Sequence, residues 1–352
     1  MAGADCIDVA ADPAVILAAK EGIAIAKERA NLVADRGLAW KGTPWLMVSL
    51  NDGEDPHFRK AEFNTMECPQ DCPRPCENIC PANAITFSQQ EHEFSGVIEQ
   101  RCYGCGRCLP VCPSQLIFTR SYVSTPSTIV PLIKELGIDA IEIHTQVGHE
   151  VDFAQLWQEI EPYAERLKLL AISCPDAPGV IEYLRYIYTI ISPLPIPLIW
   201  QTDGRPMSGD IGKGTTHAAI ALAKKVLQSG LAGYIQLAGG TNGYTVTKLR
   251  ANGLLKCHGE ENLSALRSTN QQLQSHFISG VAYGSYARSL LSPILEQLTL
   301  MNYTSSPFFP QKKQFFLQLE NNPQLLWQAV GIANDLVSQL KLSNNYHLSA
   351  NK

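Results

Sequence analysis

Short hydrophobic runs alternate with longer amphipathic stretches along most of this chain. The runs hold five to eight residues, which is the length of a buried β-strand, and the stretches between them have helical spacing. Seven strands are predicted in this way, at residues 4–11, 44–50, 139–144, 168–173, 197–201, 233–238 and 277–283. Strands that alternate with helices indicate an α/β protein with a parallel sheet.

Helices are predicted in the intervals between these strands. Asp12 and Pro13 supply an N-cap and a first-turn proline for the first helix, which extends to about residue 29. The others are expected at 127–136, 153–166, 179–190 and 215–229, in segments up to about residue 274, and from residue 285 onward.

The near-equal spacing of the strands favours a (βα)-barrel-like parallel sheet over an open, doubly wound sheet. A complete barrel has eight strands, and the start Met1-Ala-Gly-Ala-Asp5 is typical of a helix C-cap glycine followed by a strand. We therefore expect a first strand and helix to be missing from this sequence. The alternative is an open or seven-stranded sheet.

Residues 53–124 interrupt the alternation directly after the second strand. They lack long apolar periodicity and are rich in cysteine and proline, so they are predicted to form an insertion. The α/β barrel-like domain then comprises 1–52 and 125–341, and 342–352 are expected to be a disordered tail. Prolines at 69, 73 and 75 argue against one continuous helix through the first cysteines.

The composition is that of a compact globular protein. Hydrophobic residues make up 45% of the chain and charged residues only 17%, which is enough apolar material for a large core. A formal charge of -5 without a basic run gives no support for nucleic-acid binding. The most apolar stretch, 186–200, is broken by prolines and too short for a transmembrane segment. No signal peptide is recognised, and a cytoplasmic location is predicted.

Eight of the eleven cysteines gather in two runs inside the insertion, which in a reducing compartment indicates metal ligation. The second run, Cys102-x2-Cys105-x2-Cys108-x3-Cys112-Pro, has the spacing of a bacterial-type ferredoxin. In such a protein three cysteines bind one iron-sulfur cube and the fourth binds another. A zinc knot is the alternative, but it favours two separated cysteine pairs.

The first run, Cys68-x3-Cys72-x3-Cys76-x3-Cys80-Pro, supplies the partner that this pattern requires. Both runs end in the phrase Cys-Pro-x-x-x-Ile, which indicates an internal repeat with pseudo-two-fold symmetry. The symmetry predicts two crossed ligand sets, Cys68, Cys72, Cys76 and Cys112 for the first cluster and Cys80, Cys102, Cys105 and Cys108 for the second. Two 4Fe-4S clusters are expected. The wider spacing of the first run leaves a 3Fe-4S centre or a labile cube as alternatives.

The residues around the cysteines suit such clusters. Gly104 and Gly106 permit tight turns and offer N–H groups to the sulfurs, and Pro81 and Pro113 turn the chain away. Four apolar side chains are expected to keep water off the clusters: Ile85, Val111, Leu116 and Ile117.

On the barrel interpretation, functional groups lie at the carboxyl ends of the strands. The residues there are Asn51, Asp52, His144, Thr145, Asp176, Thr202, Asp203, Gly239, Gly240 and Gly284. Gly239, Gly240, Thr241 and Gly284 form a candidate site for a flavin or sugar phosphate, while a plain turn is the commoner role of a Gly-Gly pair.

The remaining motifs carry no assigned chemistry. The stretch 209–216 lacks the Ser or Thr that follows the lysine of a Walker motif, and the histidines at 144, 149 and 217 lack metal-ligand spacing. Cys6 and Cys174 are predicted to be buried structural thiols, with Cys257 beside His258 as a weak alternative site.

The two cysteine runs, the stretch from Cys6 to Pro13, strand 44–50 and loop 236–243 together resemble the cyanobacterial light-dependent period (LdpA) family. The resemblance covers essentially the whole chain. It implies an iron-sulfur circadian input protein that relays the redox state of photosynthetic electron transport to clock components such as the input kinase CikA and the Kai proteins. The cluster ligands carry over residue by residue.

Three functional hypotheses follow. The first is a redox sensor, because paired clusters occur without a recognisable catalytic set. The second is an iron-sulfur oxidoreductase that passes electrons to a flavin or another phosphate-bearing ligand in the barrel. The third, a plain electron carrier, is weakened because the α/β domain is several times larger than electron carriage requires.

Overall fold

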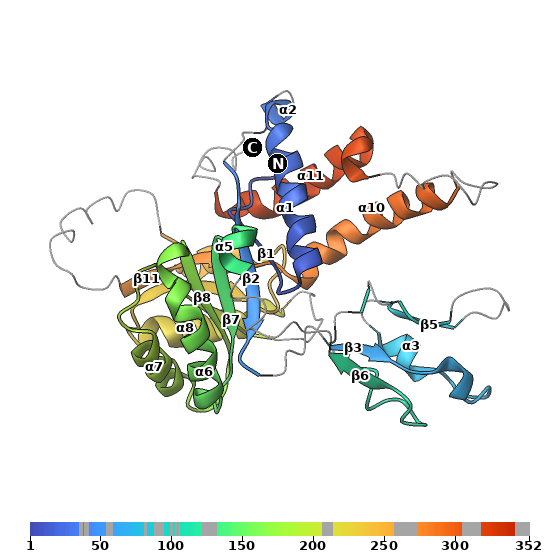
Figure 1. Cartoon of the computed structure of the whole chain (residues 1–352), viewed down its shortest axis with the longest axis horizontal. Helices are drawn as coiled ribbons and strands as arrows, with labels where there is room; N and C mark the ends of the chain where they lie inside the picture. The colour runs from blue at the N-terminus through green and yellow to red at the C-terminus, as the bar shows by residue number, and fades with distance from the viewer. Residues whose placement is uncertain are drawn as a thin grey trace, which may run out of the picture.

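The computed structural model describes residues 1–34, 38, 42–53, 59–80, 83–87, 95–98, 101–102, 104, 106–121, 132–205, 214–256, 274–304 and 318–341. They form an α/β domain and a cysteine segment that leaves this domain after its second strand (Figure 1).

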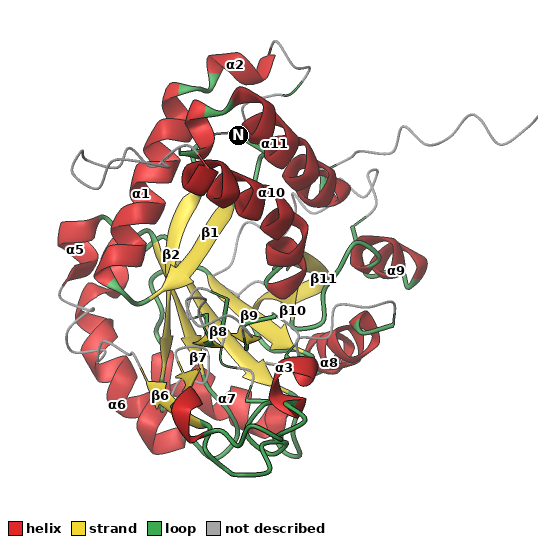
Figure 2. Cartoon of the chain, turned by 90° about the vertical axis from the view of Figure 1, so that its right-hand side faces the viewer, coloured by secondary structure: helices red, strands yellow, loops and turns green. Residues whose placement is uncertain are grey.

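The α/β domain is built on one sheet of seven parallel strands. In order across the sheet they are β1 (Cys6–Ala10), β2 (Trp45–Asn51), β7 (Ala140–His144), β8 (Leu169–Pro175), β9 (Leu198–Asp203), β10 (Gly233–Ala238) and β11 (Gln274–Val281). The sheet curls into a half-barrel with β1 and β11 at its two edges (Figure 2). The barrel-like α/β class is confirmed, in a seven-stranded form.

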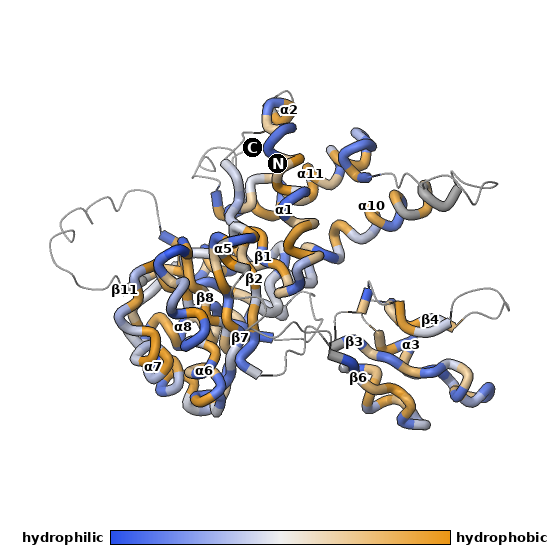
Figure 3. Tube along the Cα trace, in the orientation of Figure 1, coloured by the Kyte–Doolittle hydropathy of each residue, from blue (hydrophilic) through white to orange (hydrophobic). Residues whose placement is uncertain are grey.

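Helices connect the strands and pack on the outer face of the sheet. They are α1 (Pro13–Glu28), α2 (Asn31–Ala34), α5 (Leu132–Leu136), α6 (Glu150–Ile160), α7 (Val180–Ile191), α8 (Thr216–Gln228) and α9 (Thr245–Ala251). The predicted N-cap of α1 is confirmed, because the Asp12 carboxylate accepts hydrogen bonds from the backbone N–H groups of Ala14 (2.8 Å) and Val15 (3.1 Å). Hydrophobic and hydrophilic residues alternate along α6 and α8 (Figure 3), so each helix has an apolar face for the sheet.

Alternate residues of each strand face these helices or the inside of the half-barrel. The helix-facing residues form the main core with buried helix side chains such as Phe153 and Ile187, and they include Leu46, Val48, Leu50, Ile141, Ile143, Leu170, Ile172 and Trp200. The inward-facing residues begin with an apolar layer of Met47, Ala140, Leu169 and Ala171. Nearer the carboxyl ends they become polar, at Asp8, Ser49, Glu142, Ser173 and Gln201.

Two long helices close the described chain. They are α10 (Ser285–Thr304) and α11 (Pro323–Val337), which pack together through Ile294, Leu325 and Ala329. The α11 helix was not among the predicted elements, although Asn322 caps it and Pro323 occupies its first turn. None of the helices in the described ranges combines the length and apolar character needed to cross a membrane.

Several predicted boundaries fall where the structure describes only part of the chain. Residues 127–131 of the helix predicted at 127–136 lie outside the described residues. So do residues 257–273 and the predicted tail at 342–352. The helix predicted at 153–166 consists of α6 and a 3-10 turn, Glu161–Arg166. The last strand begins earlier than predicted, because β11 pairs with β10 from Gln274 onward.

The described part of the cysteine segment contains short elements. They are β3 (Arg59–Glu62), a 3-10 turn (Thr65–Glu67), α3 (Pro75–Ile79), β4 (Ile85–Thr86), β5 (Gly96–Val97) and β6 (Phe118–Ser121). Antiparallel pairing joins β3 to β6 and β4 to β5. An ion pair between Arg101 and Glu296 (3.4 Å) connects the segment to α10.

The close approach of α8 to the end of β9 generates a test of this fold. A Cβ atom added at Gly204 would lie 2.1 Å from the backbone nitrogen of Ala219, whereas one added at Gly331 in α11 would meet nothing within 4 Å. Gly204→Ala should therefore lower the free energy of unfolding by about 1–3 kcal/mol through overpacking. Gly331→Ala should raise it by about 0.5–1 kcal/mol, because alanine favours a helix interior. Urea unfolding followed by circular dichroism measures both, and equal effects of the two changes would contradict the described packing.

Candidate iron-sulfur site

The two halves of the cysteine segment share a pattern of backbone hydrogen bonds at positions 32 residues apart (83 and 115, for example). Three N–H to carbonyl hydrogen bonds recur at matching positions. In the first half they run from Glu77 to Arg74 (3.1 Å), from Cys80 to Glu77 (3.3 Å) and from Asn83 to Cys80 (3.2 Å). In the second half they run from Leu109 to Gly106 (3.1 Å), from Cys112 to Leu109 (3.4 Å) and from Gln115 to Cys112 (3.1 Å). The structure thus shows the internal repeat that the two Cys-Pro phrases predict.

Left-handed residues also match between the halves. Arg74 (φ 53°) occupies the position of Gly106 (φ 71°), and Asn83 (φ 47°) occupies that of Gln115 (φ 51°). The left-handed region favours glycine, so the arginine needs compensation, and its guanidinium lies 4.4 Å from the centre of the Phe87 ring. The first cysteine run is longer than the second, and its additional residues precede Arg74. The backbone conformation that the two runs share begins at Arg74.

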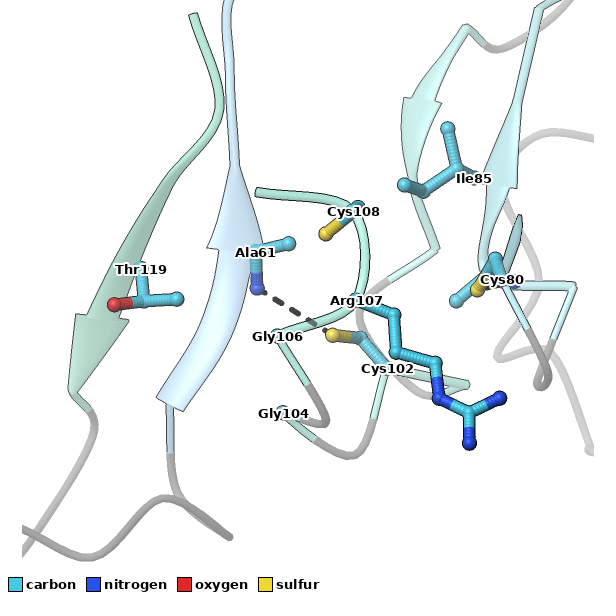
Figure 4. A pocket seen from close by; sticks show the side chains of 10 residues that line it. Ala61, Cys80, Ile85, Cys102, Gly104, Gly106, Arg107, Cys108 and Thr119 are labelled. Carbon is cyan, nitrogen blue, oxygen red and sulfur yellow. Dashed lines mark hydrogen bonds between the residues drawn. The ribbon is translucent and has the colours of Figure 1, made fainter. Parts of the chain in front are cut away.

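One pocket brings together cysteines from both runs (Figure 4). Cys80 of the first run and Cys102 and Cys108 of the second line it, together with Gly104 and Gly106. The apolar residues Ala61, Ala84 and Ile85 complete most of its wall. These three cysteines belong to the predicted second ligand set. Its fourth member, Cys105, lies outside the described residues, as does Pro81.

Two backbone N–H groups donate hydrogen bonds to sulfur atoms of this set. Ala61 in β3 donates to Cys102 Sγ at 3.4 Å, and Ala84 donates to Cys80 Sγ at 3.2 Å (Figure 4 shows the first). Such donors stabilise negative charge on thiolate sulfur, which is what an iron-bound cysteine carries. Sequence reasoning had placed this role on Gly104 and Gly106 and missed both alanines, because no residue type marks a backbone donor.

The other four cysteines form a second group. Partial burial raises the pKa of Cys68, and the neighbouring thiols of Cys72 and Cys112 raise it further. Burial likewise raises the pKa of Cys76, with Cys112 and Cys68 acting in the same direction. Cys112 therefore lies close to the cysteines of the first run, as the crossed ligand sets require. That each group binds a cluster stays a prediction.

The donor set fits an iron-sulfur cofactor. Thiols converge from separate parts of the segment, N–H donors point at sulfur, and Ile85 and Ile117 are 4% and 6% exposed, which limits water. Val111 packs against the same small core, and Leu116 is half-buried. Within the described ranges, no three Cys, His, Asp or Glu side chains are placed to hold a single metal ion.

The candidate phosphate loop is held by internal hydrogen bonds. The carbonyl of Gly240 accepts from Thr215 Oγ1 (2.8 Å), and Thr241 Oγ1 donates to the carbonyl of Ala282 (2.6 Å). A Cβ atom at Gly239 would collide with the Asp203 carboxylate, so this acidic group lies against the loop. The Asp203 carboxylate would repel a phosphate group bound at this loop. Close packing against Asp203 and Thr215 explains why Gly239 and Gly240 are glycines. Gly284 lies at the same end of the sheet, after β11, and phosphate binding stays a prediction.

The other strand-end residues separate into two groups. The Asp52 carboxylate accepts a hydrogen bond from the Thr145 hydroxyl, and Asp52 Oδ1 lies 2.9 Å from His149 Nδ1. The Thr145 hydroxyl also contacts the Tyr183 hydroxyl. Burial raises the pKa of Asp52. His144 belongs to the inward-facing polar layer, because its Nε2 lies 3.3 Å from Glu142 Oε1.

Two of the isolated cysteines, Cys6 and Cys174, lie in the part of the chain that the structure describes. Burial, followed by the nearby Asp8 carboxylate, raises the pKa of Cys6 to about 12. Burial and the carboxylate of Asp52 raise the pKa of Cys174 to about 12. Both thiols stay protonated near neutral pH, which agrees with a structural role. Cys257 and His258 lie outside the described residues.

The crossed sets predict that Cys112 and Cys108 serve different clusters. Cys112→Ser and Cys108→Ser should each lower the iron content by one cluster, and the double variant should lose both, because one substitution falls in each set. Iron and sulfide analysis of anaerobically purified protein, with EPR after reduction, measures this loss. Cys6→Ser, on β1, should leave the iron content unchanged. A double variant that loses no more iron than the single variants would show that both cysteines bind the same cluster.

The N–H group of Ala61 should tune the reduction potential of the cluster at Cys102. Ala61→Pro removes this donor, whereas Ala61→Gly keeps it. Loss of a hydrogen bond of about 1 kcal/mol corresponds to roughly 40 mV for a one-electron couple, and the potential should become more negative because the reduced state carries more negative charge. An EPR-monitored redox titration measures the shift. A glycine variant that shifts as much as the proline variant would refute the assignment.

Comparison with known proteins places this site in a family. The Light dependent period A C-terminal domain matches residues 132–339, and the LdpA Fe-S cluster-binding domain matches residues 68–123. The protein "Light dependent period A" of Synechococcus elongatus is 46% identical over 341 residues, which cover 97% of this chain and 84% of that protein. No solved structure matches the chain. The chain is an iron-sulfur protein that belongs to the light-dependent period A family.

Proposed function

We propose that this protein senses cellular redox state through two iron-sulfur clusters in its cysteine segment and relays that state to the circadian clock. The input kinase CikA and the Kai proteins are the proposed partners. The observation that carries the proposal is that the described cysteines gather across the two runs, Cys80 with Cys102 and Cys108, and Cys112 with Cys68, Cys72 and Cys76, in a segment separate from the strand-end residues of the α/β domain. The name of the Synechococcus relative, which refers to a light-dependent period, supports the connection to the clock.

A bound cluster supplies one-electron chemistry, which changes the local charge by one unit. At an effective dielectric constant near 20, one charge about 10 Å from a partner residue changes an interaction energy by roughly 1–2 kcal/mol. A complete switch between two states needs about 5.5 kcal/mol. Reduction of one cluster therefore biases partner binding without switching it completely.

Loss of a cluster offers a stronger effect on partner binding than its reduction, because the cysteine segment has a small core. Among the described residues, its buried side chains are Ala61, Cys76, Ile85, Cys108 and Ile117, and Cys76 and Cys108 are predicted cluster ligands. Because predicted ligands form part of this core, we expect the segment to depend on metal ligation to offset the loss of chain entropy on folding. We propose that ligand loss unfolds residues 64–120 and removes their surface from a partner.

The proposal is tested by partner binding in three states of the same protein. Reduced and oxidised protein should differ about 5- to 30-fold in affinity for CikA or a Kai protein, which corresponds to 1–2 kcal/mol, and cluster-free protein should differ more. Equal affinities in all three states would refute it. Hydrogen exchange supplies the internal control, because residues 59–121 should lose protection in cluster-free protein while the strands of the sheet keep theirs.

A further inference from the structure

Arg74 lies in a backbone conformation that favours glycine. Its φ angle is 53°, in the left-handed region, and its counterpart in the second half of the cysteine segment is Gly106. A long side chain persists in this region only where the surrounding structure compensates for the strain, and such residues gather at functional sites. Local backbone preference therefore does not explain the arginine, so its side chain is the feature that needs a reason.

The internal repeat places Arg74 beside the first ligand set. Gly106 and Thr119 line the pocket that contains cysteines of the second set. The residues 32 positions earlier, which is the offset of the shared backbone hydrogen bonds, are Arg74 and Phe87. Phe87 also packs against the small core that contains Cys76, a predicted ligand of the first cluster. An arginine and an aromatic ring thus take these two wall positions at the first site.

The Phe87 ring holds the Arg74 guanidinium in this wall. The guanidinium carbon Cζ lies 4.4 Å from the centre of the ring, which is within the range of a cation–π interaction. The ring is itself held by its neighbours. Its centre lies 5.8 Å from that of the Phe63 ring, and the backbone N–H of Phe87 donates a hydrogen bond to Glu77 Oε1 (3.3 Å). The position of the positive charge is therefore fixed by packing.

The charge of Arg74 reaches a predicted ligand cysteine. Burial raises the pKa of Cys68, and the neighbouring thiols raise it further, whereas the Arg74 guanidinium lowers it. A positive charge that favours the thiolate over the thiol also favours other negative charge that is added at the same place. Arg74 is half-buried, so water screens its charge less than that of a fully exposed side chain.

We propose that the Arg74 guanidinium raises the reduction potential of the first predicted cluster, and that the Phe87 ring fixes it in the position which this effect requires. A one-electron reductant adds one negative charge at the ligand set, and the net charge around such a set is one of the factors that determine its potential. The second pocket has an arginine of its own, Arg107, one position later in the repeat (Figure 4). The inference rests on the proposed binding of a cluster by the first ligand set, and it adds a residue that determines the potential at which the sensor responds.

Three substitutions at one position separate charge from backbone conformation. Arg74→Gln removes the charge and keeps a long side chain, Arg74→Gly removes the charge and the backbone strain, and Arg74→Lys keeps the charge. The full-length protein, purified anaerobically, is titrated with dithionite and followed by EPR, and the first cluster is the signal that Cys112→Ser removes. The glutamine and glycine variants should each lower the equilibrium constant for reduction about tenfold, which is 59 mV toward more negative potential for a one-electron couple. The lysine variant should shift by less than half of that.

Two further variants complete the test. Phe87→Leu, which removes the ring that holds the guanidinium, should shift the first midpoint potential in the same direction by a smaller amount, and the absence of a shift would overturn the role of the ring. Arg166→Gln removes the same charge from an exposed position in the α/β domain and should leave both midpoints unchanged. A shift there as large as that of Arg74→Gln would overturn the assignment to Arg74.

The remaining outcomes separate this inference from the function on which it rests. An unchanged first midpoint in the glutamine and glycine variants would overturn the inference, and so would an equal shift in the lysine and glutamine variants, because the charge would then have no effect. Shifts of opposite sign in the glutamine and glycine variants would assign the effect to backbone strain and overturn it as well. Failure of the sensor appears instead as equal partner affinities, and failure of the first cluster appears as unchanged iron content in Cys112→Ser, which would overturn this inference too.

Discussion

The parallel pairing of β2 with β7 is the interaction on which the rest of the structure depends. These strands are neighbours in the sheet, with Met47 opposite Ala140 and Asn51 opposite His144, although the whole cysteine segment lies between them in the sequence. Asp139 strengthens the junction. Its carboxylate accepts from the N–H of Leu46 (3.0 Å), and it forms an ion pair with Lys168 (2.6 Å) at the start of β8. The core therefore forms around a long excursion of the chain.

The pairing also places chemistry from distant parts of the sequence side by side. Ser49 and Glu142 are hydrogen-bonded across the junction, and the Asp52 carboxylate meets His149 and Thr145 just beyond it. Both polar groups gather at the end of the sheet from which the cysteine segment departs. The cysteine segment and these polar groups therefore share one boundary, the carboxyl-terminal end of β2.

The sequence predicted most of the fold because the relevant forces are local and periodic. Buried parallel strands appear as apolar runs, and the Asp12-Pro13 cap is a local hydrogen-bonding signal, so both were found. Curling of the sheet and its open edge depend on long-range packing, which one sequence does not reveal. In the site, cysteine spacing predicted which of the described cysteines lie together, but the donors from Ala61 and Ala84 were missed because they are backbone atoms. The inner polar layer did leave a signal, because Ser49, Glu142 and Gln201 each interrupt an apolar strand.

The position of the cysteine segment makes the α/β domain modular. Two neighbouring parallel strands need a crossover of about a dozen residues that usually includes a helix. The chain between the segment and β7 already contains such a helix, α5, so the connection from β2 to β7 forms a complete βαβ unit without residues 59–121. The strand pairing of the sheet is therefore compatible with cysteine segments of different length at this point of the chain.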